Sequence, residues 1–277
     1  MVRPAFWNGR KMKIKFYANS GKPEAKMAVG HLSDVARSLG LETVASVSRA
    51  PGAVVIALGG DGTILRAVHR FPDSPVLGFN LGSLGYLASV GEREFEKALA
   101  MLAQGRFKVS ERTMLEVRRV GGEVLPRRAL NDVVVVREMT GHAAVVDLAV
   151  NGRAAARYMA DGLVIATPTG STAYSLSAGG PVLMQDSGGL VVTPMNPHAL
   201  GIRPMVVRDT VELKVSSRRR VNGRAERIGV YVDGENVTAL GGGEALIVSK
   251  SPHGARLIEL DGYDPYEVMS RKLGWTK

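Results

Sequence analysis

The run Ala53-Val-Val-Ile-Ala-Leu-Gly-Gly-Asp-Gly-Thr63 joins an apolar segment to a glycine-rich turn. An unbroken apolar run of this kind is typical of a strand buried in a parallel sheet. The apolar residues of 64–69 recur at helical spacing, so the glycines lie at a strand-to-helix turn, where a free helix N-terminus favours phosphate. Asp61 would repel phosphate unless it binds a metal or takes a proton. This conflict indicates chemistry rather than plain binding.

Segments of strand-like and helical character alternate on both sides of this turn. Residues 13–18 and 75–79 have the patterns of strands, and residues 24–39 and 92–104 have the apolar spacing of amphipathic helices. This alternation predicts a parallel, Rossmann-like α/β domain over residues 1–108. Ligands of such sheets bind at the carboxyl ends of the strands, which is where Asp61 falls.

The pattern changes after about residue 108, where helical periodicity nearly vanishes. Turn signals such as Asn151-Gly152 and Asp233-Gly234 separate short strand-like runs. We therefore expect an all-β second domain over residues 109–262, a sandwich or layered sheet, and a helix-compatible segment at 263–277 that packs back on the first domain. The expected strands are 113–119, 130–137, 145–151, 163–167, 189–193, 204–208, 211–216, 228–232, 245–249 and 256–260.

Composition narrows the class of protein. The chain has 277 residues and no cysteine, which excludes thiolate chemistry and fits a cytoplasmic location. Its net charge of +10 favours anionic partners such as nucleotides or polyphosphate. Basic residues are scattered apart from the run Arg218-Arg-Arg220, and aromatic residues make up only 5%, so we expect no nucleic-acid partner. No apolar segment approaches the ~20 residues of a membrane span, so we expect no membrane partner.

Two further stretches carry polar side chains at the ends of apolar runs. Leu130-Asn-Asp132 precedes the strand-like run 133–136. The stretch Asp161–Pro181 runs from a buried strand into a loop with six hydroxyl side chains between Thr167 and Ser175, and then into a short helix. Taken alone, the Gly59–Thr63 stretch could be an ordinary tight turn, and Leu130–Asp132 could be a turn before a strand. The hydroxyl-rich part of the third stretch could be a solvated loop. Their occurrence together, each beside an apolar strand, favours a polar ligand such as phosphate or ribose.

The three stretches together resemble the signatures of the NAD kinases, in the order of that family. The resemblance extends from about residue 13 to the tail at 272–275, and the 161–181 stretch is specific to the family, whereas diacylglycerol and sphingosine kinases carry turns like Gly59–Thr63. The resemblance implies the two-domain fold described above, with a site between the domains. It also implies transfer of a phosphoryl group from ATP, or from polyphosphate in some members, to the adenosine 2′-hydroxyl of NAD, giving NADP.

The resemblance assigns roles to individual residues. Asp61 would be the general base, with Mg²⁺ or another divalent cation and the glycine backbone offsetting the triphosphate charge. Asn131 and Asp132 would hold NAD through ribose hydroxyls, and Asp161 would reach the NAD of a neighbouring subunit in a homodimer or homotetramer. The sequence does not indicate which residues hold the metal. The full set of predicted nucleotide-binding residues is Gly59, Gly60, Asp61, Gly62, Thr63, Arg66, Asn131, Asp132, His142, Asp161, Thr169, Thr172, Ala173, Tyr174, Ser175, Leu176 and Ser177.

Two positions depart from the pattern of the family. Asp132 stands where the family commonly has Glu, which shortens the side chain by one methylene. Glu235 stands where the family commonly has an amide, and its carboxylate would repel a nearby phosphate.

Two alternative functions remain beside an NAD kinase. A lipid kinase of the related superfamily would need an apolar, membrane-facing stretch, and the polar 167–177 loop counts against it. A non-catalytic NAD(P)-binding regulator would gain nothing from the Asp61 carboxylate beside phosphate.

Overall fold

The computed structural model describes residues 11–18, 21, 23–46, 52–82, 85–88, 90–138, 143–218 and 227–275. The chain divides into two compact units, the first formed by Met1–Glu111 with Ala255–Lys277 and the second by Arg112–Gly254. Each unit is described by itself.

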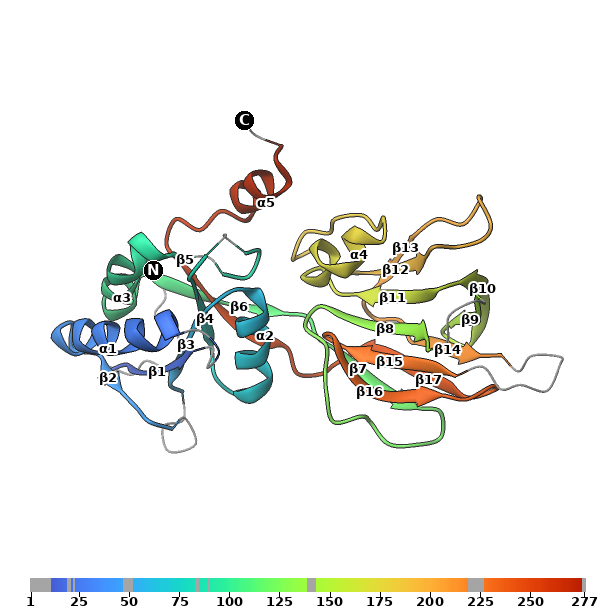
Figure 1. The fold of residues 1–277 in the computed structure, drawn as a ribbon, viewed down its shortest axis with the longest axis horizontal. Helices are drawn as coiled ribbons and strands as arrows, with labels where there is room; N and C mark the ends of the chain where they lie inside the picture. The colour runs from blue at the N-terminus through green and yellow to red at the C-terminus, as the bar shows by residue number, and fades with distance from the viewer. Residues whose placement is uncertain are drawn as a thin grey trace. The chain divides into compact units, whose positions relative to one another are not determined.

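The first unit contains one largely parallel sheet in the order β2-β1-β3-β4-β18-β6, with β5 paired to β4 (Figure 1). Its pairs β1/β2, β1/β3, β3/β4, β4/β5 and β4/β18 are all parallel. The predicted Rossmann-like character of this region is thus confirmed. The strands are β1 (Lys13–Ala18), β2 (Glu42–Thr43), β3 (Val54–Leu58), β4 (Val76–Asn80), β5 (Val90–Gly91), β6 (Phe107–Arg112) and β18 (Ala255–Leu260).

The helices of the first unit follow the predicted spacing with small shifts. They are α1 (Pro23–Ser38), α2 (Asp61–Arg70), the short 3₁₀ turn η2 (Glu92–Glu94), α3 (Phe95–Ala103) and α5 (Pro265–Leu273). Helices α1 and α3 contact each other and share one apolar core with the sheet, while α2 packs on β3 and β4. Gly78 in β4 permits that close approach, because a Cβ there would fall 2.3 Å from Cδ1 of Ile64.

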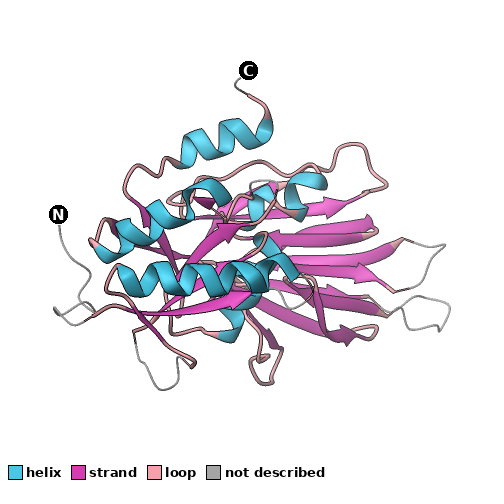
Figure 2. Cartoon of the chain, turned by 60° about the vertical axis from the view of Figure 1, so that its left-hand side comes forward, coloured by secondary structure: helices cyan, strands magenta, loops and turns pink. Residues whose placement is uncertain are grey.

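The second unit is built almost entirely of antiparallel strands in two sheets (Figures 1 and 2). A five-stranded sheet has the order β10-β9-β14-β17-β7, and a six-stranded sheet has the order β13-β12-β11-β8-β15-β16. The strands are β7 (Leu115–Arg119), β8 (Asp132–Arg137), β9 (Ala144–Val150), β10 (Arg153–Ala160), β11 (Gly162–Ala166), β12 (Gly189–Met195), β13 (Met205–Arg208), β14 (Leu213–Ser217), β15 (Ile228–Val232), β16 (Glu235–Leu240) and β17 (Ala245–Lys250).

One apolar core joins residues from both sheets of the second unit. It includes Leu148 and Val215 of the five-stranded sheet and Val133, Ile165 and Val230 of the six-stranded sheet, all almost fully buried. A smaller apolar cluster around Val164 and Val191 lies on the other face of the six-stranded sheet, under the turns η3 (Gly170–Thr172) and α4 (Tyr174–Ser177). The six-stranded sheet therefore packs on the five-stranded sheet with one face, while η3 and α4 cover part of its other face over β11 and β12, and the sandwich prediction holds.

One predicted strand lies in the other unit. The run at 256–260 was expected in the β domain, but β18 pairs in parallel with β4, with Leu257 opposite Val76. The last part of the predicted second domain therefore belongs to the first unit. A short apolar run specifies a strand but carries no signal for the sheet that it joins, which depends on long-range packing. The following helix α5 belongs to the same unit.

Within the part of the chain that the structure describes, no helix combines the length and apolar character that crossing a membrane requires. The predicted basic run at 218–220 lies mostly outside the described residues, as does His142.

Candidate functional site

The glycine-rich turn lies directly between β3 and α2. Gly59 has φ +152°, and a Cβ at this position would fall 2.3 Å from Oγ1 of Thr63. Its N–H donates to the carbonyl of Phe79 at 2.8 Å, which ties the turn to the next strand of the sheet. Gly60 precedes the first helical residue, and Gly62 is exposed. The turn is therefore close-packed on its strand side and open at Gly62.

Asp61 is the first residue of α2, and its carboxylate is held by three consecutive backbone amides. The N–H of Tyr86 donates to Oδ2 at 2.8 Å, and the N–H groups of Leu87 and Ala88 donate to Oδ1, each at 3.1 Å. Gly85 leaves room for this contact, because a Cβ there would fall 1.8 Å from Oδ1. These donors offset the carboxylate charge and fix its direction. Residues 86–88 were not among the residues predicted from the sequence.

Two basic side chains lie near this turn in the first unit. Arg66 is exposed on α2, and its Nη2 donates to Oγ1 of Thr63 at 3.3 Å. Nζ of Lys272 in α5 lies 6.0 Å from the ring centroid of Tyr86. Partial burial raises the pKa of Tyr86, and the Asp61 carboxylate raises it further. The predicted Arg66 is thus one helical turn from Asp61.

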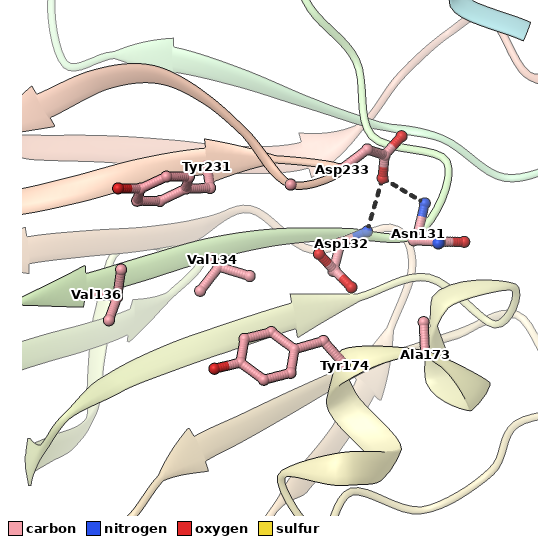
Figure 3. A pocket seen from close by; sticks show the side chains of 9 residues that line it. Asn131, Asp132, Val134, Val136, Ala173, Tyr174, Tyr231 and Asp233 are labelled. Atoms are coloured by element: carbon pink, nitrogen blue, oxygen red, sulfur yellow. Dashed lines mark hydrogen bonds between the residues drawn. The ribbon is translucent and has the colours of Figure 1, made fainter. Parts of the chain in front are cut away.

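The second unit contains a pocket of about 410 Å³ over the strands β8 and β15 (Figure 3). Figure 3 shows Tyr231 and Tyr174 on opposite sides of the pocket, with Asp132 and Val134 between them. The pocket therefore brings together four of the predicted nucleotide-binding residues: Asn131 and Asp132 from one stretch of sequence, and Ala173 and Tyr174 from another. The residues that line the pocket are Asn131, Asp132, Val134, Val136, Ala173, Tyr174, Tyr231, Asp233 and Gly234.

Asp132 is the buried acid of this pocket, with only 5% of its surface exposed. Burial raises the pKa of Asp132 to about 7, and the neighbouring Asp233 carboxylate contributes to the increase. The group therefore changes its charge near neutral pH, unlike an ordinary aspartate.

Asp233 lies in the tight turn between β15 and β16, with φ +48°. Its carboxylate accepts hydrogen bonds from the backbone N–H groups of Leu130 (2.8 Å, to Oδ2), Asn131 (2.8 Å, to Oδ1) and Asp132 (3.2 Å, to Oδ1). The sequence indicated a turn at Asp233-Gly234 and a departure from the family at Glu235, but Asp233 and the neighbouring Tyr231 were not predicted as pocket residues. Asp233-Gly234 was the available signal, since an aspartate in such a turn often accepts backbone N–H groups.

The hydroxyl groups of the 167–175 segment mostly bond to the protein itself. Thr167 donates to the carbonyl of Leu130 at 2.6 Å, and Gly170 packs so tightly on Asn131 that a Cβ would lie 2.0 Å from its carbonyl oxygen. These contacts anchor the loop beside the pocket. The other internal hydroxyl bonds join Thr169 to Gln185 (2.9 Å), Ser171 to the carbonyl of Pro168 (2.7 Å), Thr172 to the carbonyl of Thr169 (3.1 Å) and Ser175 to Thr193 (2.8 Å).

The direct ligand contacts predicted for Thr169, Thr172 and Ser175 stay predictions, but their hydroxyls have a structural role. Tyr174 differs, because 46% of its surface is exposed and its ring borders the pocket. Ser177 is exposed at the end of α4, and Leu176 is half-buried.

Asp161 lies at the opposite end of the β8/β11 strand pair from Asp132. In the β8/β11 pair, Ala166 lies opposite Asp132 and Gly162 opposite Val136, so roughly 15 Å of strand separates the two acids. Asp161 accepts hydrogen bonds from Nε of Arg137 (2.7 Å) and Nδ2 of Asn196 (2.9 Å). These two hydrogen bonds lower the pKa of Asp161. The Asp161 carboxylate therefore does not lie beside Asp132 in its own chain, although Val136, which pairs with Gly162, also lines the pocket.

Glu235 has a partner that offsets its charge. Its Oε2 lies 2.8 Å from Nη1 of Arg127, whose Nε donates to the carbonyl of Val232. Glu235 is not among the residues that line the pocket. The repulsion that its carboxylate would exert on a phosphate is therefore reduced by this ion pair.

Comparison with known proteins identifies the class of this architecture. The family model described as the ATP-NAD kinase N-terminal domain matches residues 25–107, and the one described as the ATP-NAD kinase C-terminal domain matches residues 130–260. An NAD kinase from Syntrophotalea carbinolica is 35% identical and covers 95% of this chain and 98% of its own. One from Gemmatimonas aurantiaca is 40% identical over 80% of this chain and 77% of its own.

Two solved structures share the fold over nearly the whole chain. The yeast NADH kinase complexed with NADH has a TM-score of 0.81 and 26% identity, covering 98% of this chain and 90% of its own. An NAD kinase from Archaeoglobus fulgidus in complex with ATP has a TM-score of 0.76 and 22% identity, covering 97% and 100%, which supports the fold.

The α/β unit and the β-rich unit thus form the two-domain architecture of a nucleotide kinase. The chain belongs to the NAD kinase family, since both family models and relatives over most of its length agree. The predicted activity, phosphorylation of NAD, is confirmed at the level of that family, and the alternative of a lipid kinase is not favoured.

The raised pKa of Asp132 predicts a pH-dependent stability. The folded chain holds this proton up to about pH 7 whereas an unfolded aspartate releases it near 3.8, so the free energy of unfolding falls as pH rises through this window. Asp132→Asn should remove that loss and stabilise the protein at pH 8 by up to about 4 kcal/mol, with little change at the acid end of the window. Thermal unfolding at several pH values measures the difference.

The exposed acid Asp186 in the same unit provides the matched control, since Asp186→Asn should change the melting temperature little at any pH. A stability difference between wild type and Asp132→Asn that stays constant across this range would contradict the buried-carboxyl explanation.

Proposed function

We propose that this chain transfers the terminal phosphoryl group of ATP, or of polyphosphate, to the adenosine 2′-hydroxyl of NAD in a reaction that requires a divalent cation. The observation that carries the proposal is the second-unit pocket, where Asn131, Asp132 and Tyr174 converge from separate signature stretches. The named complexes of similar proteins with NADH and with ATP support both substrates.

The pocket offers complementary chemistry for a nucleoside. The Asn131 amide and the Asp132 carboxylate are suited to ribose hydroxyls, because a carboxylate accepts and an amide both donates and accepts. The exposed ring of Tyr174, with Ala173 beside it, offers a face for stacking a base. Thr169, Thr172 and Ser175 support this segment from below through their internal hydrogen bonds.

Asp61 is the proposed general base. The attacking hydroxyl of ribose is a weak acid, and phosphoryl transfer passes through a loose transition state in which positioning of the nucleophile matters more than early removal of its proton. A carboxylate held by three backbone amides is suited to that role, since its direction is fixed before the substrate arrives. The exposed Gly62 and the side chain of Arg66 are proposed to face the phosphates of the donor.

The divalent cation is proposed to enter with the donor phosphates. Among the described residues, no group of three or more acidic or histidine side chains is placed to hold a metal ion. Mg²⁺ commonly keeps several waters and binds through substrate phosphates with few protein ligands. No step in this proposal therefore depends on a metal cage made by the chain, and the cation supplies charge neutralisation of the phosphates.

The phosphoryl acceptor can be identified directly. The protein is incubated with Mg-ATP, or with Mg-polyphosphate, and with NAD, NADH or diacylglycerol in separate reactions. We expect NADP or NADPH to form and no phosphatidic acid, with product followed by an NADP-specific dehydrogenase. Tight NAD binding without any phosphorylated dinucleotide, whatever the donor or metal, would favour a non-catalytic regulator instead.

The role of Asp61 can be separated from binding. Asp61→Asn should lower kcat by about 10²-fold or more, as loss of a general base does, while the Kd for NAD by calorimetry changes only a few-fold. Asp73→Asn removes an exposed acid from the same unit and should leave kcat unchanged. A turnover near that of wild type in Asp61→Asn would remove the assigned base.

We further propose a cytoplasmic homo-oligomer, at least a dimer, in which Asp161 contacts the NAD of a neighbouring subunit. The separation of Asp161 from Asp132 along the β8/β11 pair of its own chain supports this proposal. The bonds from Arg137 and Asn196 keep the carboxylate ionised and directed.

Mixing two defective variants tests action across subunits. Asp61→Asn and Asp161→Asn should each be impaired alone, but a mixed dimer should contain one site with both residues intact, so the co-expressed variants should regain a measurable fraction of wild-type activity. No gain over the separate variants would place Asp161 in the site of its own chain, and full activity of Asp161→Asn alone would remove its role.

A further inference from the structure

One carboxylate in the pocket has no role in the proposed chemistry. Asp233 lines the pocket, and its carboxylate oxygens accept hydrogen bonds from the backbone N–H groups of Leu130, Asn131 and Asp132. Figure 3 shows the bonds from the backbone of Asn131 and Asp132 to the Asp233 carboxylate. The N–H of Asp233 in turn donates to the carbonyl of Asp132 at 3.0 Å.

These contacts are hydrogen bonds that run in both directions between two segments of the chain. The segment 130–132 comes just before and at the start of β8, while Asp233 follows β15, so the two are neighbours at one edge of the pocket. Three N–H groups on one carboxylate leave the backbone at 130–132 little freedom. The Asn131 and Asp132 side chains therefore extend from a fixed base.

The arrangement also brings two carboxylates together in a pocket without a cation. The groups that face Asp132 are Asp233 from the β15–β16 turn, Tyr231 from β15 and Tyr174 from α4. The nine lining residues, all in the described part of the chain, include no lysine, arginine or histidine. The charge on the neighbouring Asp233 carboxylate disfavours a second negative charge on Asp132.

Resting on the proposed NAD site, we propose that Asp233 is a positioning residue for nucleotide recognition: it fixes Asn131 and Asp132 and, by its charge, sets the pH above which Asp132 accepts a ribose hydroxyl. Asp233 does not itself contact the substrate. The same carboxylate thus gives the pocket its shape and its pH dependence.

The sign of the effect follows from the protonation state. Only the ionised carboxylate of Asp132 accepts hydrogen bonds from ribose hydroxyls at both oxygens. Because burial and Asp233 raise the pKa of Asp132 to about 7, NAD binding should weaken as pH falls through neutrality. Removing the Asp233 charge removes one of the two causes and should lower the pKa, while burial remains.

The test is the pH dependence of NAD binding, measured by calorimetry and by KM at saturating Mg-ATP. The variant Asp233→Asn suits the left-handed φ of +48°, which Asn tolerates as well as Asp. We expect its Kd and KM for NAD at pH 8 to rise about tenfold, with kcat within a few-fold of wild type. The midpoint of the pH profile of Kd should move to lower pH.

The matched control is Glu235→Gln, two residues away. It removes the same charge from the same turn, but Glu235 pairs with Arg127 and lies outside the pocket lining. Its Kd and pH midpoint should match those of wild type. In Asp132→Asn, binding should be weaker and lose its dependence on pH near neutrality.

A role that is only structural would change these quantities differently. It would weaken binding equally at all pH values without moving the midpoint, and that result would overturn the proposal, as would an unchanged Kd in Asp233→Asn. If that variant does not fold by circular dichroism, Asp233→Glu keeps the charge but displaces the acceptor, so Kd should rise while the midpoint stays near that of wild type. A midpoint that moves in Asp233→Glu would also overturn it.

The experiment separates this inference from the function on which it rests. If wild type binds NAD with the expected pH profile but forms no NADP, only the proposed reaction fails. If wild type forms NADP but Asp233→Asn keeps its midpoint, only the role of Asp233 fails.

Discussion

Three consecutive backbone N–H groups on one carboxylate occur in both units of this protein, and the arrangement of the candidate site depends on them. Asp61 accepts from residues 86–88 in the first unit, and Asp233 accepts from residues 130–132 in the second. An acid near a polyanionic substrate is costly unless its charge is met by donors, and backbone amides meet it without adding a side chain. In each case the bonds also fix a loop that the strand order alone would leave free.

The two carboxylates accept the same kind of hydrogen bond, but the bonds have different consequences in the two units. At Asp61 the amides direct the acid itself, which is the proposed reactive group. At Asp233 the acid directs the amides, and the proposed binding groups are the side chains that those amides carry. The hydroxyls of Thr167, Thr169 and Ser175 play a comparable part, because their hydrogen bonds hold the 167–175 loop beside Asn131 rather than facing solvent. Much of the polar composition of these stretches is thus used to build the pocket.

Periodicity in the sequence was sufficient for the alternating α/β unit and for most strands of the β unit, because buried strands such as β3 are unbroken apolar runs. It missed β5 and β6 of the first unit. In the second unit it missed β10, whose Arg-Ala-Ala-Ala-Arg run has no β-branched residue, and β16, which lies at a sheet edge. The signature stretches located Asn131, Asp132, Ala173 and Tyr174, which meet in one pocket. Tyr231, Asp233 and residues 86–88 could not be found in this way, because their roles arise from contacts between segments far apart in sequence.

The return of β18 to the first sheet has a consequence for how the chain is made. Strand β18 pairs with β4, yet the entire second unit lies between them in the sequence. During synthesis the first sheet therefore stays incomplete, with the edge of β4 uncovered, until the β unit has emerged from the ribosome. The β unit, whose strands all lie within one continuous segment, can complete its own core first. Strand β18, which follows the β unit in the sequence, then completes the first sheet, so the first unit can finish folding only after the second unit has been made.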